Sequence, residues 1–178
     1  MKYASILQNA PAIQCAQERA PLLQLRTSFV LSTPFPTITA DTLVEEFELF
    51  FDWDERYQYL IELGNAMVAL PVEYQCEENR VQGCLSTVWL VCQESTGDPT
   101  RLVYAADSDS QLVKGLVAIL VQLYNQKTPD EILQLDIVDV FARIELTQHI
   151  SRSRANGVHS MIGRIKTLAL NHTTGANP

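Results

Sequence analysis

The most restrictive feature of the sequence is a pair of apolar segments that are separated by a turn and followed by an apolar helix. Residues 85–93 contain the run Val-Trp-Leu-Val-Cys, which is typical of a buried strand. Gly97-Asp98-Pro99 predicts a turn, and residues 101–106 then form the return strand. From Val113 to Tyr124 the apolar residues recur every three or four positions, as they do on one face of a helix. A hairpin followed by such a helix predicts an antiparallel sheet with helices packed on one face.

Further helices are expected on both sides of this unit, and a short strand over residues 79–82 precedes the hairpin. The expected signals are an N-cap at Asp41 or Thr42, an apolar stripe from Tyr57 to Met67, an N-cap cluster at residues 107–110, a capping box at Thr128-Pro129-Asp130-Glu131, a short helix over 135–144 and a long one from Ser151 to Leu170. The predicted fold class is therefore α+β, with a small antiparallel sheet of about three strands packed against a layer of helices.

The chain of 178 residues suits one domain, and its composition changes at both ends. Residues 1–38 contain four of the eight prolines and no glycine, which predicts a poorly ordered or loosely docked N-terminal arm. We expect the ordered domain over residues 39–172 and a C-terminal tail over residues 173–178. The arm has few acidic residues, but too few arginines to favour organellar targeting.

The overall charge limits the classes of partner. The net charge is −8, with −14 over residues 41–142 and +4 from residue 143 onward. An acidic chain is not expected to bind nucleic acid, and no apolar run is long enough to span a membrane. An acidic body with a basic end instead favours an electrostatically steered protein partner. The four cysteines are unevenly spaced, which argues against a disulfide framework and favours a reducing compartment such as the cytoplasm.

Most signatures of catalysis or metal binding are missing from the sequence. It has no glycine-rich phosphate loop and no Cys-x-x-Cys pair, and its three histidines are not spaced like zinc ligands. We therefore expect no cofactor and no metal. His159 falls beside the apolar stripe of the last helix, which predicts an exposed helix residue. The other two histidines are His149 and His172, near predicted helix ends.

Cys84 is the candidate functional residue that remains. It lies between two predicted strands and directly follows Gly83, which can adopt a positive φ and allow another backbone to come close. A thiol on a loop can be presented to a partner, whereas Cys92 lies inside an apolar run and is expected to be inert. Cys76 lies beside carboxylates that would raise its pKa, and Cys15 lies in the arm. These arguments alone leave a purely structural role for Cys84 open.

Three motifs in this order resemble the SufE family of sulfur-acceptor proteins. They are Gly83-Cys84-Leu85-Ser86-Thr87-Val88-Trp89, then Asp107-Ser108-Asp109 with Val113-Lys114-Gly115-Leu116, then Ser151-x-Ser153-Arg154-x-Asn156-Gly157. The likeness runs from about residue 41 to residue 170, which is nearly the whole predicted domain.

The resemblance implies a role for three residues and a set of partners. Cys84 would accept sulfur as a persulfide, Arg154 would lie near it and take part, and Asp109 would affect the mobility and docking of the cysteine loop. The sulfur donor would be a cysteine desulfurase, which carries the pyridoxal phosphate itself, and the recipient an iron–sulfur cluster assembly scaffold. The chain would then stimulate the desulfurase rather than act as a free-standing enzyme.

One residue departs from the family pattern, and two other functions stay open. Leu85 stands where many family members have glutamine, so this chain lacks an amide that could hydrogen-bond the loop or the partner. The chain could instead be an iron–sulfur scaffold of similar fold, although ligation by Cys84 would need further converging thiolates. It could also be a thiol redox enzyme in which Cys76 resolves an oxidised Cys84. The oligomeric state and the role of the arm are not predicted.

Overall fold

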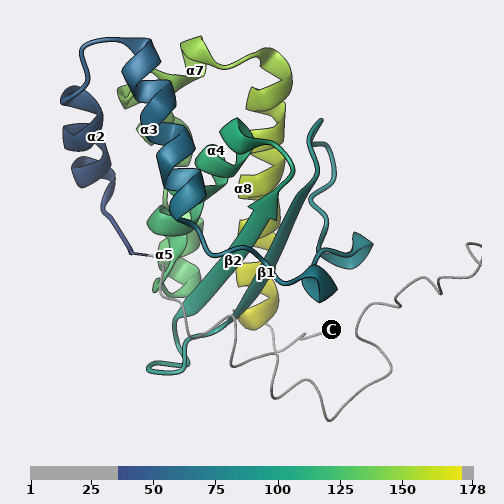
Figure 1. Ribbon diagram of the computed structural model, residues 1–178. Helices are drawn as coiled ribbons and strands as arrows, with labels where there is room; N and C mark the ends of the chain where they lie inside the picture. The colour runs from purple at the N-terminus through teal and green to yellow at the C-terminus, as the bar shows by residue number, and fades with distance from the viewer. Residues whose placement is uncertain (1–35, 174–178) are drawn as a thin grey trace, which may run out of the picture.

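The computed structural model describes residues 36–173 (Figure 1). The arm predicted over residues 1–38 lies outside the described residues up to residue 35, and the predicted tail lies outside them from residue 174. None of the helices between residues 36 and 173 combines the length and the apolar character that a membrane span requires.

The described chain is α+β, with one antiparallel hairpin between two groups of helices along the sequence. Single 3-10 turns at Val72–Tyr74 and Glu77–Asn79 lead into the hairpin. In order, the main elements are α2 (Ala40–Glu48), α3 (Trp53–Ala66), β1 (Val88–Glu94), β2 (Leu102–Ser108), α4 (Gln111–Tyr124), α5 (Pro129–Gln134), α6 (Ile137–Arg143), α7 (Leu146–His149) and α8 (Arg152–Thr173). The predicted fold class is therefore confirmed.

The sheet is smaller than expected. Strands β1 and β2 pair antiparallel in a register that sets Val91 opposite Ala105. In place of a third strand, the described chain has a single bridge between Arg80 and Trp89, supported by a 2.8 Å bond from Val81 N to the Val88 carbonyl. Because the 3-10 turn at Glu77–Asn79 ends directly before Arg80, too few residues are extended there to form a longer strand.

Helix α4 is the centre of the molecule. It packs against α3, against β2 and against α8, and every residue from Gly115 to Tyr124 is buried. A helix that is apolar on all sides in this way is expected to be surrounded by protein. Two glycines allow α3 and α4 to touch, because a Cβ placed on Gly115 would lie only 2.2 Å from the Leu60 carbonyl oxygen and one on Gly64 would lie 2.8 Å from Gly115 N.

Several predicted boundaries are corrected by the structure. Thr39, not Asp41 or Thr42, is the N-cap of α2, since its backbone is extended and its Oγ1 accepts from Thr42 N at 3.1 Å. The predicted N-cap cluster over residues 107–110 belongs partly to β2, which continues to Ser108. Helix α7 is not predicted by the sequence, because four residues are too few to show a helical period.

The capping box of α5 and the long last helix are confirmed. Thr128 Oγ1 accepts from Glu131 N, and a Glu131 carboxylate oxygen accepts from Thr128 N at 2.7 Å. Helix α8 runs along the back of the hairpin in Figure 1, and the buried Tyr104 hydroxyl donates to the Ile165 carbonyl of α8 at 3.2 Å. This contact fixes α8 against β2 and thereby places the start of α8 beside the loop that carries Cys84.

Candidate functional site

Cys84 lies in a five-residue loop, residues 82–86, that is fixed at both ends. On the N-terminal side, Val81 is held by its bond to the Val88 carbonyl. The sequence predicts a strand from residue 85, but β1 begins at Val88. Residues 85–87 are released from the sheet because the backbone of Thr87 is bound by another part of the chain.

Thr87 is held at the junction between β2 and α4. Its N–H donates to Asp109 Oδ1 at 3.0 Å, and its carbonyl accepts from Ser108 Oγ at 2.9 Å and from Asp109 N at 3.3 Å. Asp109, one of the three predicted site residues, therefore lies at the base of the cysteine loop and does not line the pocket beside Cys84. In this position its carboxylate restrains the loop through the backbone.

Two glycines determine how closely the loop approaches α8. Gly83 has φ +85°, a left-handed conformation that a side chain disfavours, and a Cβ there would lie 2.6 Å from Ser160 Oγ. Gly157 presents its bare backbone to Cys84, whose Sγ donates to the Gly157 carbonyl at 3.5 Å. A Cβ on Gly157 would come within 3.4 Å of that sulfur. The loop thus lies directly on the first turns of α8.

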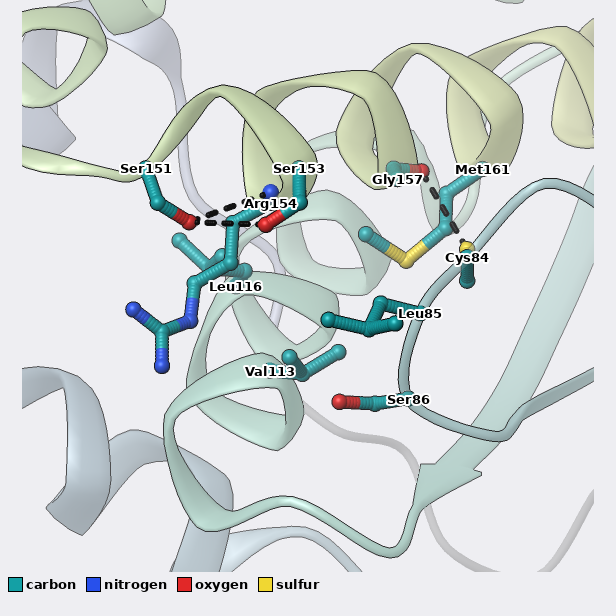
Figure 2. A pocket seen from close by; sticks show the side chains of 10 residues that line it. All are labelled: Cys84, Leu85, Ser86, Val113, Leu116, Ser151, Ser153, Arg154, Gly157 and Met161. Carbon is teal, nitrogen blue, oxygen red and sulfur yellow. Dashed lines mark hydrogen bonds between the residues drawn. The ribbon is translucent and has the colours of Figure 1, made fainter.

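A small cavity of about 120 Å³ opens beside the Cys84 sulfur (Figure 2). One part of its wall is apolar, and the other is formed by polar residues at the start of α8. The lining consists of Cys84, Leu85, Ser86, Val113, Leu116, Ser151, Ser153, Arg154, Gly157 and Met161. The cavity is large enough for one or two additional atoms attached to the sulfur and is too small for a substrate of ordinary size.

Arg154 lines the same cavity as Cys84, but its charged end is not directed at the sulfur. In Figure 2 its side chain extends away from Cys84, toward the opposite end of the cavity. Ser151 begins α8 by accepting from Arg154 N at 3.4 Å, and its hydroxyl lies 3.0 Å from that of Ser153. The structure therefore brings two of the predicted site residues to one cavity without a contact between their reactive groups.

Burial disfavours the thiolate form of Cys84 in this arrangement. It raises the pKa of the half-buried thiol above the ordinary value near 9. Burial raises the pKa of Cys92 further, to about 12, despite a hydrogen bond with Tyr104 that lowers it. Cys92 is thus the less reactive of the two free thiols in the described chain, as its place in an apolar run predicts.

The polar groups of the described residues outside this cavity include no cluster suited to a metal ion. Between residues 36 and 173, no three His, Cys, Asp or Glu side chains converge closely enough to hold an ion. His159 is exposed on α8, as expected, and His149 stacks on Trp53 at a ring separation of 3.7 Å. Neither of these two histidines lines the cavity beside Cys84, so Cys84 remains the candidate functional residue.

Residues 41–169 match the family model SufE, whose description is "Fe-S metabolism associated domain". This span includes the cysteine loop, the two glycines Gly83 and Gly157 at its contact with α8, Asp109 at its base, and the start of α8. The chain belongs to the SufE family. The resemblance that the three sequence motifs indicated is thus confirmed, and with it a general place in iron–sulfur metabolism.

Relatives with this family name share much of the sequence. An uncharacterised SufE-like protein of Rhizobium meliloti (strain 1021) is 42% identical over 131 residues, covering 72% of this chain and 93% of its own length. A second, from Rhizobium etli, is 42% identical over 128 residues, covering 71% of this chain and 86% of the relative. A solution structure of a hypothetical protein from Thermus thermophilus has the same fold, with a TM-score of 0.62 at 15% identity. That similarity covers 76% of this chain and 96% of the other.

Sequence reasoning missed the acceptor for the resting thiol in this SufE protein. Gly157 provides both the close approach and the carbonyl that binds the Cys84 sulfur. The available signal was a glycine inside a helical pattern, which often marks close packing by another segment. The family motifs indicated that this turn lies near Cys84, but they did not indicate that the backbone of Gly157 itself accepts from the thiol.

Proposed function

We propose that this SufE protein accepts sulfur from a cysteine desulfurase as a persulfide on Cys84, stimulates that enzyme, and passes the sulfur to iron–sulfur cluster assembly. The observation that carries the proposal is the half-buried Cys84 thiol, on a loop with fixed ends, beside a cavity of about 120 Å³. The desulfurase contributes the pyridoxal phosphate, and this chain itself uses no cofactor. A cytoplasmic location stays a prediction, and the cysteines no longer support it, because Cys76 is disulfide-bonded rather than a free thiol.

The transfer needs one nucleophile on this chain. The Cys84 thiolate attacks the outer sulfur of the donor persulfide, a new sulfur–sulfur bond forms on Cys84, and the donor's own sulfur leaves as a thiolate. No external oxidant or reductant is consumed, because the sulfane sulfur keeps its oxidation state. The proton that Cys84 loses before attack goes to solvent or to the departing donor thiolate.

The resting geometry explains why the donor is needed. In the closed loop, burial keeps the thiol neutral by raising its pKa, and its hydrogen bond to Gly157 directs the sulfur inward. Displacement of the loop by a docked donor would release the Cys84 sulfur from the Gly157 carbonyl and from the burial that raises its pKa, which increases the fraction of thiolate at the point of transfer. Arg154 is available at the rim to stabilise that charge after its side chain turns.

The cavity also offers a place for the persulfide after transfer. Once loaded, the outer sulfur can occupy the space lined by Leu116, Val113 and Met161, where solvent and small reductants have poor access. Burial in such surroundings disfavours the charged persulfide and slows its loss. A sheltered persulfide would then persist until a recipient opens the loop again.

The test is a loading reaction followed by mass spectrometry. The full-length chain is incubated with a cysteine desulfurase from the same organism and with cysteine, and the intact mass is measured. We expect the addition of one sulfur atom, located on Cys84, together with faster alanine release by the desulfurase. Cys84→Ser should abolish both effects, whereas Cys92→Ser, checked for folding by circular dichroism, should retain them. Loading of the Cys84→Ser variant would refute the assignment.

A further inference from the structure

The cysteine loop carries an exposed leucine that takes no part in the proposed sulfur transfer. Leu85 is 85% exposed, although it directly follows Cys84. In Figure 2 its side chain lies over the cavity, on the side of the loop that faces Val113. Among the large hydrophobic residues exposed between residues 36 and 173, Leu85 is the one that lines the Cys84 cavity.

Geometry determines what covers this leucine, provided that the proposed function holds. A sulfur atom can pass to Cys84 only when the donor sulfur approaches to bonding distance, about 2 Å. The Cα atoms of neighbouring residues are about 3.8 Å apart, so whatever reaches Cys84 also reaches Leu85. A donor that reaches the Cys84 sulfur therefore also comes close to the exposed isobutyl group of Leu85.

The start of α8 supplies a second recognition element. Arg152 is exposed there and pairs with no carboxylate in the described part of the chain. It lies outside the residues that line the Cys84 cavity, whereas Arg154, two positions later, is one of them. An exposed leucine at the cavity, with arginines at the start of the neighbouring helix, is complementary to an apolar socket with carboxylates in the surrounding surface.

We propose that Leu85 is the apolar anchor of the complex with the sulfur donor, and that it enters an apolar socket of the desulfurase while Arg152, outside the cavity, is attracted by carboxylates on the surrounding surface of that enzyme. This inference rests on the proposed function and adds the residues that recognise the donor. Leu85 determines mainly how long the complex lasts, because its contact forms only on close docking. Arg152 determines mainly how fast the complex forms, because charges act at a distance.

The test measures the dissociation constant between the full-length chain and the same desulfurase at low and high salt. Leu85→Gln, which keeps the side chain similar in length, should raise the dissociation constant at least tenfold (about 1.4 kcal/mol) at both salt concentrations. Arg152→Gln should raise it severalfold at low salt and much less at high salt. Leu170→Gln, at a residue that is 47% exposed near the other end of α8, serves as the matched control and should bind like the wild type.

A second readout separates the two proposals. Cys84 in the Leu85→Gln variant should still be loaded by inorganic polysulfide, and by the desulfurase at saturating concentration. If the wild type is loaded but Leu85→Gln binds within twofold of it, the anchor is refuted and the carrier function stands. If the desulfurase does not load the wild type at all, the proposed function fails and the anchor fails with it.

Discussion

Replacing Gly83 by alanine tests whether the cysteine loop depends on its close contact with α8. The φ of +85° at Gly83 costs an alanine about 1–2 kcal/mol. The new Cβ would also lie 2.6 Å from Ser160 Oγ, and moving that hydroxyl out of its preferred rotamer costs about 0.5–1.5 kcal/mol. Together these effects predict that Gly83→Ala lowers the free energy of unfolding by roughly 1.5–3.5 kcal/mol.

A double-mutant cycle separates the two contributions. In a Ser160→Ala background the close oxygen is gone and the next atom, Ser160 Cβ, lies at an ordinary 3.6 Å. Gly83→Ala should then cost only the conformational part, so the cycle should give a coupling of about 0.5–1.5 kcal/mol. The measurement is urea unfolding followed by the fluorescence of Trp53 and Trp89.

Gly97→Ala is the matched control, since nothing lies within 4 Å of its Cβ position and its φ is not positive. It should change the free energy of unfolding by no more than about 0.5–1 kcal/mol. If Gly83→Ala were as mild as this control, or if its cost were the same with and without the Ser160 hydroxyl, the loop would not depend on this contact.

Two further predictions concern the core and the thiol. Gly115→Ala should destabilise the protein by about 2–3 kcal/mol in urea unfolding, because the added Cβ would lie 2.2 Å from the Leu60 carbonyl oxygen and the helices cannot both keep their places. Gly163→Ala, with nothing within 4 Å, should instead be neutral or stabilising, and equal effects would contradict the close crossing. Alkylation of Cys84, followed by peptide mass mapping, should accelerate with a midpoint above about pH 9, because burial raises the pKa of the folded thiol. The contribution of the Cys84 thiol to the free energy of unfolding should be complete below its pKa in the unfolded chain, and it should be lost as the pH rises through its pKa in the folded protein. An alkylation midpoint that is lower in the folded protein than in the denatured chain would contradict this prediction.

The sequence predicted local features better than contacts between distant segments. The capping box at Thr128 and Glu131 depends on residues three positions apart, and it is present as expected. The start of β1 was predicted three residues too early, because the restraint on Thr87 comes from Asp109, on the far side of the hairpin. A pattern of apolar residues contains no information about that bond.

At the candidate site, too, some features were predicted from the sequence and others were not. The family motifs predicted that Arg154 lies near Cys84, and in the structure both residues line one cavity. The direction of the Arg154 side chain could not be predicted, because an exposed arginine at a helix start has several allowed rotamers. The acceptor at Gly157 was missed for a related reason, since a backbone carbonyl carries no sequence signal of its own.

The fixed ends of the cysteine loop limit how a carrier of this design can work. Cys84 lies three residues from Val81 and three from Thr87, so an extended chain lets it move at most about 10 Å from either. It cannot swing between two sites as a long tether would. On the proposed function, a supplier and a consumer of sulfur would have to meet Cys84 at the same opening and in turn. The two would compete for one face, and delivery would depend on the whole protein leaving the first before it meets the second.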